Sequence, residues 1–237
     1  TTRAPPRRYN TVFQYLVRLK RVQLELEEAW ALMRGRRRIS GARLRLMQLR
    51  QHMAHLITNL QIYFQVDVIE AEYSSLLQRM DDAHDFAEVE RAHHQYLTAL
   101  ISQTFLDVTV VSQSLTRIIE QCRALCHMVR LDDGSAHATA ADDREVKELM
   151  AAFLDSSNTL YRCFRSNRLA GSQRAPFLRQ LLLRLNFNSY YSDVAARSLL
   201  QRMPASAAAA AAAAPLPPTT GHAANYGSYP TARPLAR

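Results

Sequence analysis

The feature that most constrains this chain is a helical spacing of apolar residues, which continues with few interruptions from Tyr9 to about Ser189. β-Strands would require apolar and polar residues to alternate, and such alternation is nearly absent. Hydrophobic residues make up 48% of the 237 residues, which is enough for one substantial core. The sequence therefore predicts an all-α fold, a helical bundle of about six helices in residues 9–195, with a long central helix and a disordered C-terminal tail.

The first expected helix ends at Gly35, a residue that commonly follows the last turn of a helix. Its apolar residues recur at helical spacing and define one stripe, which consists of Val12, Leu16, Leu19, Leu26, Trp30 and Met33. We expect this stripe to face the core, so that truncating Trp30 would leave a costly cavity.

The second expected helix, residues 41–80, is the longest and carries two apolar stripes. One consists of Leu49, Met53, Leu56, Leu60 and Tyr63, and the other consists of Ile62, Val66, Ile69 and Tyr73. A helix that is apolar on two sides is usually enclosed within a bundle. We therefore expect a central core helix, with a partner-binding second face as the alternative.

The remaining helices follow recognisable start signals. Asp81, Asp82 and Asp85 are candidate caps for a third helix, and a fourth helix, residues 108–129, has apolar residues spaced three and four apart. A fifth helix is expected at about residues 142–165. After Pro176, a short apolar segment predicts the final helix.

The two ends of the chain differ from this pattern. Residues 1–8 contain three arginines and two prolines, and residues 196–237 contain an alanine run followed by proline-rich sequence. Such compositions bury little apolar surface, so both ends are expected to be disordered. No run of 18 or more uncharged apolar residues occurs, so no membrane span is expected.

Reactive side chains are present but do not form an active-site pattern. Glu90 and His93 match half of the motif of a di-iron bundle, which needs a second pair, so we interpret His93 as a core or capping residue. His52 and His55 are three residues apart, but no cysteine pair completes a metal site with them. The three cysteines are expected to be small buried hydrophobic residues. We predict no enzymatic activity, cofactor, metal or small-molecule substrate.

The net charge of +9 would attract an acidic partner, whether nucleic acid, lipid or protein. The densest basic cluster consists of Arg34, Arg36, Arg37, Arg38, Arg43, Arg45 and Arg50. It could contact phosphates, or it could be a solvated loop and helix start. Because no base-stacking aromatic residues accompany it, nucleic acid is an unlikely partner. A basic helical module that binds nucleic acid or another acidic partner is the alternative function.

Three stretches in this order resemble the gamma-tubulin complex component family. The first begins Tyr9-Asn-Thr-Val-Phe and continues as a basic amphipathic helix to Trp30; the second runs from Leu49 through Asn59 and Asp67 to Val68. The third, Leu181 to Tyr191, is similar to a family stretch in which an Asp stands at the position of Asn186. A salt bridge at that position is therefore in doubt.

The resemblance implies a non-enzymatic scaffold that binds gamma-tubulin and other gamma-tubulin complex components within a ring-type complex. It also implies a role in microtubule nucleation at organising centres, such as a centrosome or spindle pole, in the cytoplasm. Polar and aromatic residues of the second and third stretches are the expected partner-binding residues, because such side chains are enriched at interfaces. They are Arg50, Asn59, Tyr63, Asp67, Asn188, Tyr190 and Tyr191.

Overall fold

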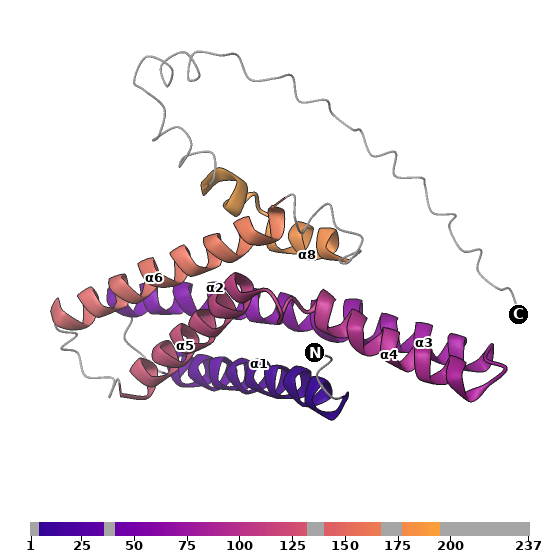
Figure 1. The fold of residues 1–237 in the computed structure, drawn as a ribbon. Coiled ribbons are helices and arrows are strands. Elements are labelled where there is room, and N and C mark those ends of the chain that lie inside the picture. Colours follow the sequence, from indigo (N-terminus) through magenta and orange to yellow (C-terminus); the bar gives the residue numbers. More distant parts are fainter. Residues whose placement is uncertain (1–4, 36–40, 132–139, 167–176, 195–237) are drawn as a thin grey trace, which may run out of the picture. The chain divides into compact units, whose positions relative to one another are not determined.

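The structure, a computed structural model, describes residues 5–35, 41–131, 140–166 and 177–194. Its helices are α1 (Pro5–Arg34), α2 (Gly41–Ile62), the π-helix η1 (Tyr63–Glu70), α3 (Ala71–Asp81), α4 (Phe86–Gln103), α5 (Thr109–Leu131), α6 (Ala140–Arg165) and α8 (Leu178–Leu185) (Figure 1). Within these ranges no residue forms a strand, and the all-α prediction is confirmed. The proposed tail, residues 196–237, lies outside the described residues.

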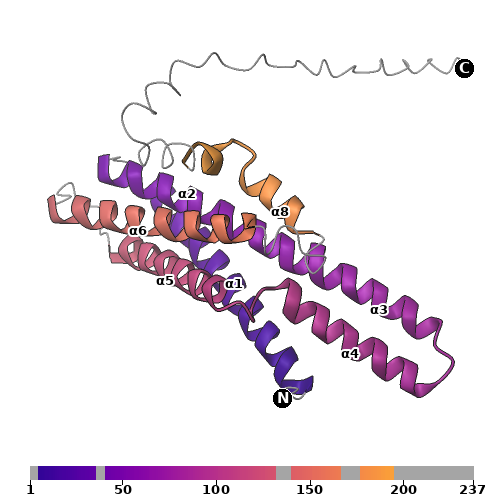
Figure 2. The ribbon, with the colours of Figure 1, turned by 45° about the horizontal axis from the view of Figure 1, so that its top comes forward.

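Helices α2, η1 and α3 form one continuous rod, as expected for the long central helix. Helix α1 packs along α2 and α5, and α6 covers α5 and α2. The short α8 contacts α2 and α6. Helices α3 and α4 run side by side as a hairpin, and α4 also packs against α1 (Figures 1 and 2). The rod therefore passes through the bundle at one end and forms half of a hairpin at the other.

Helix α1 differs from its prediction at two places. It begins at Pro5, four residues before Tyr9, because proline suits the first turn of a helix. Its buried stripe consists of Val12, Tyr15, Leu19, Val22, Leu26, Ala29 and Met33. The prediction that Trp30 is a core residue is wrong: Trp30 is 38% exposed, because the small Ala29 occupies the inward position in this turn.

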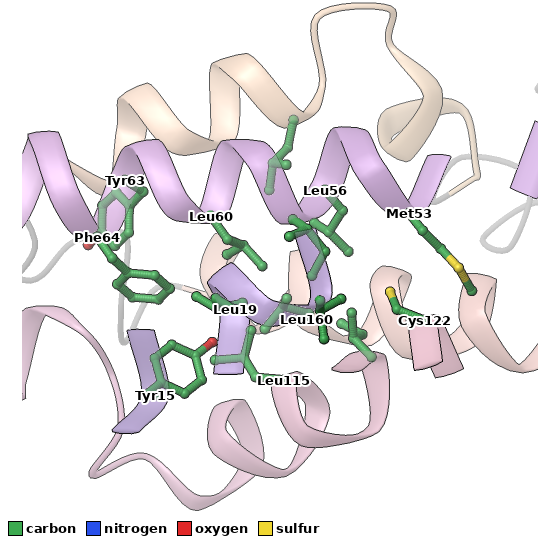
Figure 3. Close-up of a cluster of buried hydrophobic side chains, with 14 of the residues drawn as sticks. Tyr15, Leu19, Met53, Leu56, Leu60, Tyr63, Phe64, Leu115, Cys122 and Leu160 are labelled. Carbon is green, nitrogen blue, oxygen red and sulfur yellow. The ribbon is translucent and has the colours of Figure 1, made fainter. Parts of the chain in front are cut away.

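The core lies where α1, α2, α5 and α6 meet (Figure 3). Figure 3 shows Leu19 of α1 below the α2 side chains Leu56 and Leu60, and Leu115 of α5 below Leu19, so that Leu19 lies between α2 and α5. The predicted seam of α5 is confirmed, because its residues from Val111 to Val129 with spacings of three and four are fully buried. Burial of many branched side chains in one cluster is the main stabilising contribution to such a bundle.

The two stripes of the rod have opposite environments. All five residues of the first stripe, from Leu49 to Tyr63, are fully buried. Of the second stripe, Val66 is 51% exposed, Ile62 and Tyr73 are also exposed, and only Ile69 is half-buried. The prediction of a rod enclosed on both sides is therefore wrong for this second stripe.

The hairpin turn is fixed by local capping. Asp85 has an extended backbone and accepts a hydrogen bond from Glu88 N at 2.7 Å, while the Glu88 carboxylate accepts one from His84 N at 2.8 Å. This reciprocal arrangement satisfies backbone donors at the start of α4. Asp85 is thus a helix cap, as predicted.

Candidate functional site

The second and third sequence stretches, more than 100 residues apart, meet in the structure. Helix α8 and the turn after it pack on α2 and η1, where Arg184 forms an ion pair with Asp67. The Asp67 side chain is only 10% exposed, so this pair is shielded from water on one side. Asp67 belongs to the π-helix, and π-helical segments often occur at functional sites.

Tyr63 and Asn59 lie inside the bundle. The Tyr63 hydroxyl donates to the backbone oxygen of Gln103 at 3.0 Å, and its ring stacks on Phe105 with 6.3 Å between centroids. Phe105 has a positive φ of 54°, an unusual conformation for an aromatic residue. Tyr63 therefore supports the corner between α4 and α5. Asn59 is also buried and donates to the backbone oxygen of His55 at 2.9 Å.

The C-terminal tyrosines surround His52 of α2. Its ring lies 5.0 Å from the ring of the half-buried Tyr190 and 6.3 Å from that of Tyr191. Tyr191 is buried, stacks on Tyr161 at 4.6 Å, and shares a hydrogen bond with Ser157. Ser157 is thus a buried polar residue on α6, where the neighbouring buried residues Phe153, Leu160 and Phe164 are apolar.

Burial shifts the acid–base equilibria in this cluster. It raises the pKa of Tyr191 to about 12, although the hydrogen bond with Ser157 acts in the opposite direction. It lowers the pKa of His52, and the neighbouring His55 lowers it further. The pKa of His55 is lowered by burial and partly restored by its hydrogen bond with the backbone of Arg184. The cluster therefore favours neutral imidazoles packed among aromatic rings.

The turn after α8 is held by Asn186. Its side-chain oxygen accepts from Ser192 N at 3.1 Å, and its amide donates to Ser192 Oγ at 2.7 Å. Asn186 therefore holds the turn through hydrogen bonds, without a salt bridge. Asn188 is exposed, and its side-chain oxygen accepts from Tyr190 N at 3.3 Å.

Two apolar side chains beside this turn point outward and were not predicted. Phe187 is 73% exposed, and its ring contacts that of His55 in a tilted arrangement with 5.3 Å between centroids. Leu183, one turn earlier, is 65% exposed. Their spacing of four residues, off the buried stripe of Leu178, Leu181 and Leu185, is the signal in the sequence that could have identified them.

Arg50 is buried on the side of α2 that faces α1. Its Nε donates to the backbone oxygen of Leu26 at 3.0 Å, and its guanidinium lies 5.4 Å from the centre of the Trp30 ring. The contact joins α2 to α1 through a cation–π interaction. Arg50 thus connects two helices within this structure.

The part of the basic cluster that the structure describes is not an open arginine patch. Arg36, Arg37 and Arg38 lie outside the described residues. Of the others, Arg43 and Arg50 are buried, Arg45 pairs with Asp143, and Arg34 is exposed. Because three of these four side chains turn towards the protein, the described part of the cluster offers little to a phosphate backbone.

His93 is half-buried, and its Nε2 lies 2.8 Å from the Tyr9 hydroxyl, a contact between α4 and α1. Among the described residues, no three His, Cys, Asp or Glu side chains are grouped to hold a metal ion. Cys122 and Cys126 are buried as predicted, whereas Cys163 is half-buried against the core. In the described ranges no helix is both long and apolar enough to cross a membrane.

Comparison with known proteins gives a family match over most of the chain. The family described as Gamma tubulin complex component C-terminal matches residues 2–191. Gamma-tubulin complex component 4 of Arabidopsis thaliana is 42% identical over 211 residues, which cover 81% of this chain and 28% of that protein. The Homo sapiens component 4 is 35% identical over 188 residues, or 78% of this chain and 28% of that protein.

A more distant relative has a different component number. Gamma-tubulin complex component 3 of Arabidopsis thaliana is 28% identical over 145 residues, which cover 54% of this chain and 17% of that protein. The chain thus spans little more than a quarter of the length of the component 4 relatives. The matched residues 2–191 include both the helical bundle and the cluster around His52.

Proposed function

Because the chain belongs to the gamma-tubulin complex component family, we propose that it is a non-enzymatic scaffold that binds gamma-tubulin within a ring-type complex. In this role it supports microtubule nucleation at organising centres of the cytoplasm, such as a centrosome or spindle pole, together with other complex components. The family match over residues 2–191 carries the proposal. Holding a partner in position requires a rigid surface and no reactive side chain.

The segment after α8 has the rigidity that such a task needs. Four sets of contacts fix it: the Asp67–Arg184 ion pair, the two Asn186 hydrogen bonds, the stacking of Tyr191 on Tyr161, and the contacts of Tyr190 with His52. A surface that is already ordered loses less conformational entropy when it binds. The segment therefore presents its outer side chains in one arrangement.

We assign the gamma-tubulin contact to the outer side of this segment. Leu183, Phe187 and Asn188 are exposed, and Tyr190 is partly accessible. Exposed aromatic residues bordered by polar groups are frequent at the centre of interfaces. The other residues of the predicted set act from beneath by supporting this surface or the helices that carry it. They are the buried Asn59, Tyr63, Tyr191 and Arg50 and the half-buried Asp67.

Phe187→Ser tests the proposed contact, with Leu131→Ser as the matched control. Both side chains are more than 70% exposed, but Leu131 lies at the end of α5. Co-sedimentation or size-exclusion chromatography with purified gamma-tubulin should show at least a tenfold loss of affinity for Phe187→Ser. Leu131→Ser should bind as the wild-type chain does, and both should keep its melting temperature within a few degrees.

Two results would contradict different parts of the proposal. If the wild-type chain retains no gamma-tubulin at low salt, direct binding by this chain is wrong. If it binds and Phe187→Ser binds equally well, the function stands and the assigned surface is wrong. A supporting role for Tyr190 predicts that Tyr190→Ala lowers both stability and binding, since its ring packs on His52.

A further inference from the structure

The α3–α4 hairpin has a charge opposite to that of the chain as a whole. Residues 70–103, the hairpin together with the last residue of η1, contain seven Asp and Glu residues and two Arg residues, in a chain whose net charge is +9. Several of the carboxylates, including those of Glu70, Asp81, Asp82 and Glu90, are exposed and form no ion pair with the described residues. The hairpin is therefore a local acidic surface on a basic protein.

An exposed apolar stripe follows the same element. It continues the second stripe of the rod and consists of Ile62, Val66, Ile69, Tyr73, Leu77 and Met80. Five of these six side chains are exposed, and Ile69 is half-buried. At about 1.5 Å per helical residue the stripe is roughly 25 Å long. Phe86, which is 81% exposed, stands at the start of α4 near the Met80 end.

The structure shows why the stripe is exposed. On the side of α3 next to the stripe, Leu76 is buried, and Arg79 beyond it donates to Gln95 of α4 at 2.9 Å, so α4 covers that side and leaves the stripe open. Tyr73 reaches towards Tyr96 of α4, with 6.4 Å between ring centroids, yet remains half exposed. Among the described helices α3 packs chiefly against α4 and η1. Figure 2 shows the end of the hairpin, where α3 meets α4, projecting beyond α2, α5 and α6.

Charge and apolar side chains occur together on this surface. On a helical projection, Glu70 and Asp81 flank the stripe on the side away from α4. A continuous apolar stripe bordered by carboxylates complements a helix with one apolar face and lysine or arginine residues beside it. Contiguous exposed apolar residues of this kind usually mark an interaction site in a soluble protein.

We infer that the outer face of the α3 hairpin binds a basic amphipathic α-helix of a partner protein. The helix would lie along the stripe for about five turns, with its apolar side chains on Val66, Tyr73, Leu77 and Met80 and its basic side chains near Glu70 and Asp81. This surface is separate from the Phe187 surface. This acidic surface attracts a basic partner, whereas the net positive charge of the whole chain attracts an acidic one.

A pair of synthetic helices tests the inference. One is an 18-residue peptide with leucines at helical spacing and lysines elsewhere, and the other has the same leucines with glutamates in place of the lysines. Fluorescence anisotropy with the whole chain should show the lysine peptide binding at least tenfold more tightly than the glutamate peptide. The preference should decrease as the salt concentration rises, because exposed charges are screened.

Matched variants locate the binding. Leu77→Ser with Met80→Ser should weaken binding of the lysine peptide at least tenfold, and so should Glu70→Lys with Asp81→Lys. The controls are Leu131→Ser and Asp155→Lys, which change an exposed apolar and an exposed acidic residue on α5 and α6. The controls should bind as the wild-type chain does. All four proteins should keep the wild-type melting temperature within a few degrees, since the altered side chains are exposed.

Several outcomes would overturn the inference. These are equal binding of the two peptides, equal losses in the hairpin variants and the controls, or no binding of the lysine peptide at low salt. Concentration-dependent self-association that Leu77→Ser with Met80→Ser abolishes would assign the surface to a second copy of the chain instead. Gamma-tubulin binding is measured separately on the same variants and should be unchanged, so failure here leaves the proposed function untouched.

Discussion

Helices α2 and α3 belong to one continuous rod but have different environments. Helix α2 lies against α1, α5, α6 and α8, and its stripe from Leu49 to Leu60 is fully buried. Helix α3 packs chiefly against α4 and leaves the stripe through Tyr73 and Leu77 exposed. Helical periodicity therefore identifies apolar faces, whereas the helices packed against them decide which of these faces become core.

The largest expected difference between the two halves concerns stability. Leu56→Ala in α2 should lower the free energy of unfolding by about 2–5 kcal/mol, because Leu56 is 1% exposed and its truncation leaves a cavity. The urea midpoint with an unchanged slope would measure this loss. Leu77→Ala in α3 is the matched control and should change stability by less than about 0.5 kcal/mol. Equal losses would show that the exposed stripe is core.

The second prediction concerns the ion pair that joins η1 to α8. Asp67→Ala should cost about 1–3 kcal/mol, since it leaves the partly buried Arg184 without its carboxylate. The estimate is reduced because the Arg184 side chain remains 30% exposed to solvent. Glu148→Ala removes an exposed partner of Arg144 and should cost less than about 1 kcal/mol. A comparable loss in both variants would mean that Asp67 acts as a surface charge.

The third prediction follows from the corrected position of Trp30. Trp30→Ala should cost about 1–2 kcal/mol, which represents partial burial and the contact with Arg50, rather than the 3–5 kcal/mol of a core truncation. Chemical denaturation measures this difference. A double-mutant cycle with Arg50 would separate the cation–π contact from simple burial. A loss above about 3 kcal/mol would place the indole in the core after all.

Trp30 also shows how far the sequence determines the fold. The periodicity and the signals at Gly35 and Asp85 were sufficient to predict the helices and several of their ends. They could not decide between Ala29 and Trp30, since adjacent residues differ by only 100° and the larger side chain appeared the better core residue. The packed neighbours α2 and α5 determine the rotation of α1, and no local pattern encodes that rotation.

The candidate site was less predictable for a related reason. Asn59 and Arg50 have polar groups, which suggested surface positions, but each donates to a backbone oxygen inside the protein. Tyr63 belongs to the first apolar stripe, so its burial was expected, whereas its hydrogen bond to Gln103 was not. The acceptors of Arg50 and Tyr63, on Leu26 and Gln103, belong to other helices, so neither contact could be predicted before the fold was known. The exposure of Phe187 was not predicted, because an apolar residue beside a buried stripe is normally assigned to the core.

The smallest expected effect concerns pH and separates the His52 cluster from the hairpin. Burial lowers the pKa of His52 and of His55, so the unfolded chain takes up these protons at a higher pH than the folded chain. Stability is therefore complete above the unfolded pKa, near 6.5, and decreases as the pH falls towards the folded pKa values. Urea midpoints at pH 7.5 and 5.5 should show this decrease.

The groups that face the two imidazoles support this direction of change. His52 meets Phe153, Tyr190 and Tyr191, and His55 meets Phe187 and the backbone of Arg184, so these contacts provide no carboxylate to stabilise a protonated ring. His52→Gln with His55→Gln should therefore reduce the difference between the two midpoints. The same loss in variant and wild type would exclude the cluster as its source. A loss confined to the wild type would identify the two imidazoles as the source of the pH dependence. Unchanged peptide binding by the hairpin at pH 5.5 would show that the other half of the rod is unaffected.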